Sequence, residues 1–100
     1  MMDCEVRNDK VIVKLGTYLE RENASAQIGF FKRALSYNKP ILFQASEIHQ
    51  IDTSSLQVLL SFTHLLGNKS LEWEWDGPSD VLKKMAETLD IHKQLKLNAC

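Results

Sequence analysis

The sequence is poor in the residues that mark several specialised classes of protein. Its 100 residues include two cysteines and four glycines, too few for a disulfide framework or a glycine-rich phosphate loop. The formal net charge is −1, so no basic surplus points to nucleic acid. No apolar stretch approaches the roughly 20 residues of a membrane span, and the first ten residues lack a signal-peptide core. We therefore expect a cytoplasmic protein without direct membrane insertion.

What is present is the composition of an ordinary soluble domain. Apolar residues make up 44% of the chain and charged residues 25%. A chain of this length can build one core, so we expect a single domain over residues 1–100. We expect Cys4 and Cys100 to be reduced thiols, with a disulfide joining the two ends of the chain as the alternative.

Apolar periodicity and turn residues predict an alternation of strands and helices. The expected order is two strands at residues 4–8 and 10–16, a helix from about 24 to 38, a strand at 40–46, a helix from 53 to about 66, a strand at 70–77 and a helix from 78 or 79. Strands alternating with helices imply an α/β fold, here a mixed sheet of about four strands with helices packed on it.

The same patterns predict which side chains face the core. The expected inward residues are Ala24, Ile28, Phe31 and Leu35 on the first helix, Leu56, Leu59, Leu60, Thr63 and Leu66 with Val58, Phe62 and Leu65 on the second, and Val81, Leu82, Met85 and Leu89 on the third. Leu71, Trp73 and Trp75 should share one face of the last strand, and Ile91 and Leu95 should pack near the C-terminus. Asn23 is expected to cap the first helix, and Gly67-Asn68 to end the second.

One short stretch, "DTSS" at residues 52–55, concentrates polar groups directly before the most apolar helix. Asp and Thr are good N-cap residues, so Asp52 or Thr53 can satisfy the open amides of the helix start. A phosphate on Thr53 would also meet the positive end of the helix dipole. Composition alone favours simple capping over a functional role.

The segment "IDTSSLQVLLSF", together with the order of elements and the chain length, resembles the STAS domain, the fold of bacterial anti-anti-sigma factors. The family pattern is Asp, Ser or Thr, two small residues ending in Gly, then Leu. Asp52, Thr53, Ser54 and Leu56 match it, and Ser55 stands where the family usually has Gly. The closing "WDGPSDVLKKMAETLDIHKQLKL" also resembles the family, so the resemblance covers almost the whole chain.

The resemblance implies a binding protein rather than an enzyme. In the family, the hydroxyl residue after the Asp is phosphorylated by a partner kinase that is also the anti-sigma factor, which here implies Thr53, with Ser54 as a secondary candidate. The implied partner-binding residues are Asp52, Thr53, Ser54, Ser55 and Gln57. The implied partners are a serine/threonine kinase or anti-sigma-like protein and a phosphatase, in a bacterial signalling pathway. In STAS subunits of phospholipid ABC transporters the same place docks on the ATPase, and this is the alternative.

The remaining reactive residues indicate no further site. His49, His64 and His92 show no ligand spacing to one another or to the cysteines, so we expect no metal and no cofactor. No Ser-His-Asp arrangement can be argued from the sequence, and we expect no catalytic residue.

Overall fold

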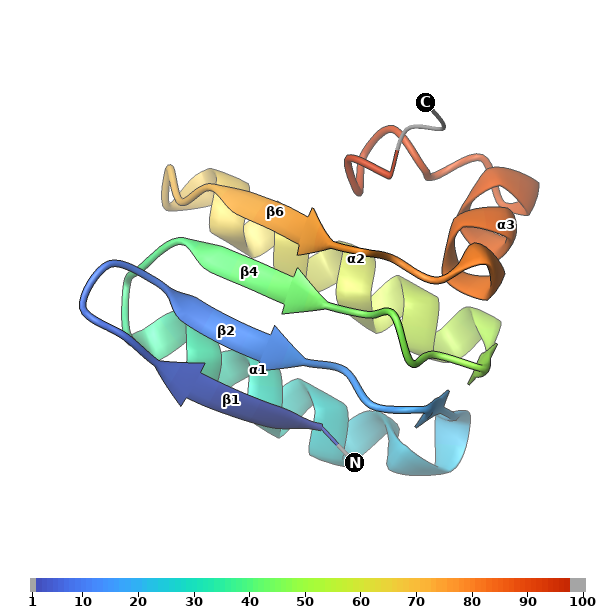
Figure 1. Cartoon of the computed structure of the whole chain (residues 1–100), viewed down its shortest axis with the longest axis horizontal. Helices are drawn as coiled ribbons and strands as arrows, with labels where there is room; N and C mark the ends of the chain where they lie inside the picture. The colour runs from blue at the N-terminus through green and yellow to red at the C-terminus, as the bar shows by residue number, and fades with distance from the viewer. Residues whose placement is uncertain (1, 98–100) are drawn as a thin grey trace.

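Four strands form one mixed sheet, and they run in the order β1-β2-β4-β6. The computed structural model describes residues 2–97. β1 (Asp3–Val6) is antiparallel to β2 (Val11–Lys14), whereas β4 (Ile41–Gln44) is parallel to β2, and β6 (Trp73–Asp76) is parallel to β4. The arrows in Figure 1 show this arrangement, with β1 alone running in the opposite direction. The predicted α/β fold with a mixed sheet of about four strands is confirmed.

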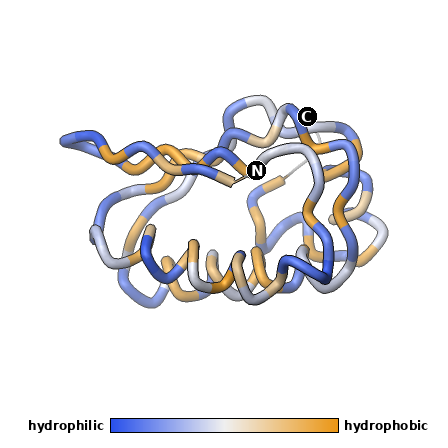
Figure 2. The backbone as a smooth tube through the Cα atoms, turned by 90° about the horizontal axis from the view of Figure 1, so that it is seen from below, coloured by the Kyte–Doolittle hydropathy of each residue, from blue (hydrophilic) through white to orange (hydrophobic). Residues whose placement is uncertain are grey.

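Two helices cover one face of this sheet. α1 (Ala24–Ser36) connects β2 to β4, and α2 (Thr53–Asn68) connects β4 to β6. They lie side by side behind the strands in Figure 1, and Figure 2 shows the helical layer beneath the strands, with hydrophobic residues recurring in both. α3 (Asp80–Thr88) follows β6 at the carboxyl end of the parallel strands. Parallel neighbouring strands need a crossover connection, which is usually a helix. Here α1 and α2 are these crossovers, and both bury the same face of the sheet.

A chain of aromatic side chains runs through the core between the two layers. Trp75 of β6 stacks on Phe43 of β4, with ring centroids 4.5 Å apart. Phe43 meets Phe62 of α2 edge-on at 6.0 Å, and Phe62 stacks on Phe31 of α1 at 4.6 Å. Such pairs contribute about 0.5–1.5 kcal/mol each beyond the area they bury. The contacts therefore fix both helices against the sheet.

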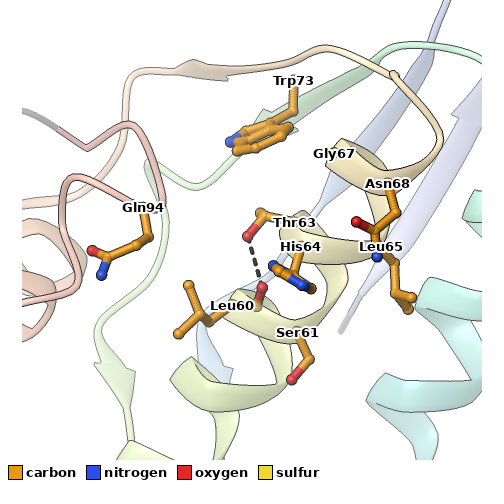
Figure 3. A pocket seen from close by; sticks show the side chains of 9 residues that line it. All are labelled: Leu60, Ser61, Thr63, His64, Leu65, Gly67, Asn68, Trp73 and Gln94. Atoms are coloured by element: carbon orange, nitrogen blue, oxygen red, sulfur yellow. Dashed lines mark hydrogen bonds between the residues drawn. The ribbon is translucent and has the colours of Figure 1, made fainter.

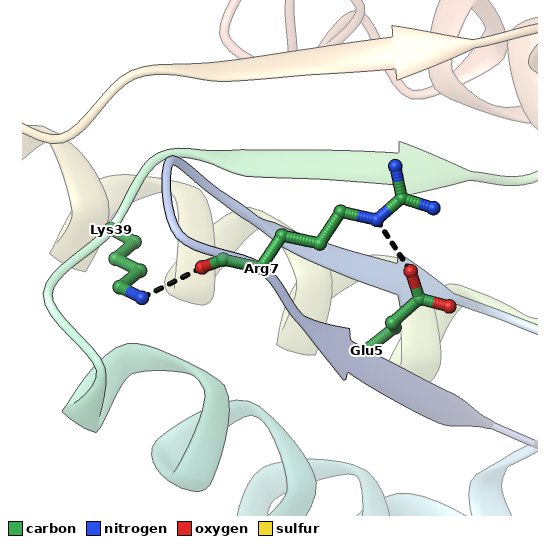
Figure 4. Close-up of polar contacts among 3 residues, drawn as sticks. All are labelled: Glu5, Arg7 and Lys39. Carbon is green, nitrogen blue, oxygen red and sulfur yellow. Dashed lines mark hydrogen bonds and ion pairs between the residues drawn. The ribbon is translucent and has the colours of Figure 1, made fainter.

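Polar contacts hold the β1–β2 hairpin at the opposite end from α3. The amide of Arg7 donates to the carbonyl of Lys10 (2.8 Å), which closes the predicted turn. The Arg7 side chain pairs with Glu5, and Nζ of Lys39 donates to the Arg7 carbonyl at 2.7 Å (Figure 4). Lys39 precedes β4, so this bond joins the hairpin turn to the connection that follows α1. Exposed pairs of this kind contribute little stability, about 0–1 kcal/mol.

Several predicted inward residues are exposed instead. Ile28 is 43% exposed, because α1 turns Gln27, Phe31 and Ala34 toward the core and so presents a face one residue away from the expected one. Leu65 is 46% exposed, whereas the rest of the predicted α2 stripe is buried or half-buried. On the third helix, Leu82 and the unpredicted Ala86 are buried, Met85 is half-buried, and Val81 and Leu89 are exposed. Each helix buries a narrower stripe than its apolar residues suggest.

The helix ends also differ from the expectation. Asn23 occupies the N-cap position of α1 but its side chain makes no capping bond, since Arg21–Asn23 form a 3-10 turn, η1, that leads into the helix. α2 continues through Gly67 and Asn68, and the left-handed residue that follows its end is Ser70, with φ 58°. The helix predicted from residue 78 or 79 begins at Asp80, because Ser79 is its N-cap and its hydroxyl accepts from the amide of Leu82 at 3.2 Å.

Two very short strands were not predicted. β3 (Tyr18–Leu19) and β5 (Gln50–Ile51) pair in parallel as a separate two-stranded sheet. Leu19 and Ile51 are buried, so this pair belongs to the core. The carbonyl of Leu19 then accepts from the amide of Asp52 at 3.1 Å. The small sheet therefore places the first turn of α2 beside the segment that precedes α1.

Leu95 is buried and Ile91 is half-buried, as predicted, and the C-terminal segment packs against β6. The indole N–H groups of Trp73 and Trp75 both donate to the carbonyl of Leu95, at 3.2 and 2.7 Å. Cys4 lies half-buried in β1 and Cys100 lies outside the described residues, so the state of these cysteines stays a prediction. Within residues 2–97, the structure has no helix long and apolar enough to cross a membrane.

Candidate functional site

The candidate site is the first turn of α2, where the polar stretch at residues 52–55 meets the helix. Asp52 has an extended backbone, with φ −93° and ψ 170°, and serves as the N-cap. Its side-chain Oδ1 accepts from the amide of Ser55 at 2.9 Å, and its carbonyl accepts from the amide of Leu56 at 3.0 Å. The sequence left open whether Asp52 or Thr53 caps this helix, and the structure assigns the role to Asp52.

The first turn is also bonded to the segment before α1. The second carboxylate oxygen of Asp52, Oδ2, accepts from the amide of Arg21. Nε2 of Gln27 donates to the hydroxyl of Ser55 at 3.1 Å and to the carbonyl of Glu20 at 3.2 Å. Residues almost 30 positions apart in the sequence therefore meet around the start of α2.

The predicted site residues differ in their exposure. Thr53 and Gln57 are exposed, and they lie four residues apart, which places them on the same side of the helix. Asp52 and Ser54 are half-buried. Ser55 is 1% exposed, so its hydroxyl faces the protein interior and Gln27 rather than the surface. The surface that a partner can reach here therefore consists of Thr53 and Gln57, with the outer parts of Asp52 and Ser54.

The electrostatics of the site involve the carboxylates of Asp52, Glu20 and Glu22 and the cation of Arg21. The hydrogen bond from the Ser55 amide lowers the pKa of Asp52 below its ordinary value, and the bond from the Arg21 amide acts in the same direction, while partial desolvation opposes both. The pKa of Glu20 is raised, first by a hydrogen bond with Glu22 and then by desolvation and by the nearby charges of Glu22 and Asp52. The charge of Arg21 lowers the pKa of Asp52 further, so Asp52 is ionised at neutral pH.

Sequence reasoning missed Gln27, Glu20 and Arg21 as parts of this site. Glu20 and Arg21 contribute backbone groups, which no side-chain pattern reveals. Gln27 did leave a signal, because it lies four residues before the buried Phe31 and so falls on the core stripe of α1. A polar residue on such a stripe indicates a buried partner, although it does not say which one.

A separate opening lies further along α2. It has a volume of about 770 Å³ and is lined by the second half of α2 with Trp73 and Gln94. Figure 3 shows His64 and Thr63 at this opening, and the Thr63 hydroxyl donates to the carbonyl of Leu60 at 2.8 Å. None of the nine lining residues is a carboxylate, so His64 has no Asp or Glu partner in this opening. The first turn of α2 does not take part in it.

The fold is that of STAS-domain anti-sigma factor antagonists. No family model and no curated protein sequence matches this chain, so the likeness comes from solved structures. The anti-sigma factor antagonist SpoIIAA in its unphosphorylated form aligns with a TM-score of 0.77 over 94% of this chain and 84% of its own, at 14% identity. The Bacillus SpoIIAA in its phosphorylated form aligns with a TM-score of 0.73 at 14% identity, over 94% of this chain and 87% of its own.

Two further structures agree on the fold. The Thermotoga maritima protein TM1081 aligns with a TM-score of 0.80 over 96% of this chain and 78% of its own, at 19% identity. The STAS domain of an anti-sigma factor antagonist from Rhodobacter sphaeroides aligns with a TM-score of 0.63 over 82% of this chain and 94% of its own, at 18% identity. The sequence-based expectation of a STAS fold is therefore confirmed at the level of architecture.

Proposed function

We propose that this chain is a phosphorylation-controlled regulator in a bacterial signalling pathway, which binds a serine/threonine kinase or anti-sigma-like protein through the start of α2. The observation that carries the proposal is the exposed Thr53, which directly follows the capping Asp52. The same fold occurs in SpoIIAA, whose structure is known in unphosphorylated and phosphorylated forms. Thr53 is the proposed acceptor, with Ser54 second because it is less exposed. A phosphatase would reverse the modification.

The chemistry of the helix start supports a switch that leaves the fold intact. A phosphate on Thr53 brings about −1.5 to −2 charges at neutral pH. The unpaired amides and positive dipole end of the helix favour an anion there, by about 0.3–1 kcal/mol. Three carboxylates, those of Asp52, Glu20 and Glu22, and one cation, Arg21, already lie near one another here, and the phosphate would add further negative charge to this group. A partner that binds the neutral hydroxyl closely would have to desolvate this added charge, which weakens binding.

The direct test is to incubate the protein with a purified candidate partner kinase and to map the phosphorylated residue. We expect modification of Thr53 in the wild type and none in Thr53→Ala. Modification of Ser54 or of another residue, with Thr53 unmodified, would move the switch elsewhere.

Binding measurements separate a switch from permanent docking. We expect Thr53→Ala to bind the partner like the wild type and Thr53→Glu to bind at least fivefold more weakly, since leaving a buried polar group unpaired costs about 1–3 kcal/mol, and a charged group more. Ser61→Glu is the matched control, because Ser61 is exposed on the same helix two turns away. If both Thr53 variants lose binding, the residue is a docking contact, as in the transporter-subunit alternative. Full binding by Thr53→Glu would exclude Thr53 from the interface.

A further inference from the structure

Two buried polar side chains meet between α1 and the first turn of α2. Gln27 is 2% exposed and Ser55 is 1% exposed, and the Gln27 amide donates to the Ser55 hydroxyl at 3.1 Å. Burying an amide and a hydroxyl is unfavourable unless each has a hydrogen-bond partner, and here each side chain is a partner of the other. The Ser55 hydroxyl is therefore the side-chain partner of Gln27 on α2.

These two residues belong to a closed circuit of hydrogen bonds. Gln27 donates to both the Ser55 hydroxyl and the carbonyl of Glu20, which uses both hydrogens of its amide. The amide of Ser55 donates to one oxygen of Asp52, and the other oxygen of Asp52 accepts from the amide of Arg21. Arg21 follows Glu20 in the chain, so the circuit returns to its starting point. It joins α1, the first turn of α2 and the residues Glu20 and Arg21, where η1 begins.

Thr53 lies between two members of this circuit in the sequence, Asp52 and Ser55. The circuit bonds both of them and leaves Thr53 exposed. We propose that Gln27 is a positioning residue for the candidate switch: from α1 it sets the place of the first turn of α2, and with it Thr53, relative to the Glu20–Arg21 backbone. The meaning of this role for signalling rests on the proposed function, but the structural coupling does not.

The exchange rate of the Arg21 amide tests the coupling without any partner. Gln27→Met keeps the length of the side chain but removes both donors, and we expect Arg21 exchange to accelerate about two- to tenfold, the effect of losing one ordinary hydrogen bond. Thr63→Val is the matched control, since Thr63 is also buried on α2 and its hydroxyl bonds only the nearby carbonyl of Leu60. This control variant should lower the melting temperature without selectively accelerating exchange of the Arg21 amide.

The double variant Gln27→Met with Ser55→Ala separates positioning from stability. Replacing both partners by apolar groups restores much of the melting temperature lost in the single variants, because no buried donor or acceptor is left unpaired. Glu20 keeps one donor, the amide of Asn23 at 3.0 Å. We expect Arg21 exchange to stay fast in this double variant. Recovery of Arg21 protection together with the melting temperature would show that Gln27 has only a packing role, and would overturn the proposal.

The rate at which the kinase phosphorylates Thr53 tests whether this positioning matters for function. We expect Gln27→Met and the double variant to lower kcat/KM for phosphorylation at least threefold, and Thr63→Val to leave it unchanged. An unchanged rate in both Gln27 variants, despite fast Arg21 exchange, would also refute the positioning role. If even the wild type is not phosphorylated, the proposed function fails, and the exchange comparison alone then decides the role of Gln27.

Discussion

Removing the Asp52 carboxylate is the sharpest test of how the site is built. Asp52→Ala deletes both side-chain bonds that this residue makes, one to the Ser55 amide within α2 and one to the Arg21 amide outside it. The first is a helix cap, whose loss costs typically about 1 kcal/mol. The second is a tertiary bond to a half-exposed carboxylate, to which we assign about 1 kcal/mol. The expected loss in free energy of unfolding is therefore about 2 kcal/mol.

This loss is large enough to measure by thermal unfolding at pH 7. For a chain of 100 residues, each kcal/mol moves the melting temperature by about 4–8 °C, so Asp52→Ala should melt about 10 °C lower. Asp52→Asn is the control, because its amide oxygen can still accept from Ser55 while the charge is gone. It should fall between the wild type and Asp52→Ala. A melting temperature of Asp52→Ala within about 2 °C of the wild type would mean that neither bond contributes.

Acid pH gives an independent check on the charge. The pKa of Asp52 is lower in the folded protein than its ordinary value, so its carboxylate stabilises the fold at pH values above that ordinary value. This contribution is lost as the pH falls below about 4 and through the lowered folded pKa. The difference in melting temperature between the wild type and Asp52→Asn should therefore shrink over this range. A constant difference from pH 7 to pH 2 would contradict the assignment.

Two further predictions concern the core and the C-terminal segment. Leu59→Ala should lower the free energy of unfolding by about 2–5 kcal/mol. Leu60→Ala should lower it by clearly less, because Leu59 is 1% exposed whereas Leu60 is half-buried. Equal losses in urea denaturation would mean that the orientation of α2 is wrong. Trp75→Phe keeps an aromatic ring beside Phe43 but removes the 2.7 Å bond to the Leu95 carbonyl. Limited proteolysis should therefore cut within residues 91–97 faster than in the wild type, and an unchanged cleavage rate would show that this bond does not hold the segment in place.

The order of strands and helices was predictable because it depends on local periodicity. Alternation in "LEWEW" and the helical spacing of leucines in α2 are visible in any window of ten residues. β3 and β5 were missed because a strand of two residues has no period to detect. The exposure of Ile28 was missed for a different reason. Of the neighbours Gln27 and Ile28, the buried residue is Gln27, and its hydrogen-bond partner Ser55 lies 28 positions away, where no local pattern can indicate it.

The position of the polar helix start was predictable from the sequence, but the separate structural roles of its residues were not. The motif and the apolar helix behind it indicated residues 52–55 as a polar helix start, and the structure has its helix start there. The sequence does not indicate that Ser55 points inward. It also does not indicate that Asp52 accepts a hydrogen bond from the amide of Arg21 in addition to the one within its own helix. Both facts depend on how β3 and η1 are placed beside α2, which is set by tertiary packing.

Asp52 caps the helix while Thr53 is exposed, so one motif can combine capping with a residue that is free to be modified. If Thr53 supplied the cap, a phosphate on its hydroxyl would remove a bond worth about 1 kcal/mol, and modification would be coupled to fraying of α2. Asp52 makes that bond instead, through the Ser55 amide, and it remains ionised at neutral pH. The fold therefore does not depend on the Thr53 hydroxyl as a cap. A charge added there can alter the surface that a partner meets while the helix beneath it stays capped, which is the property that a reversible switch requires.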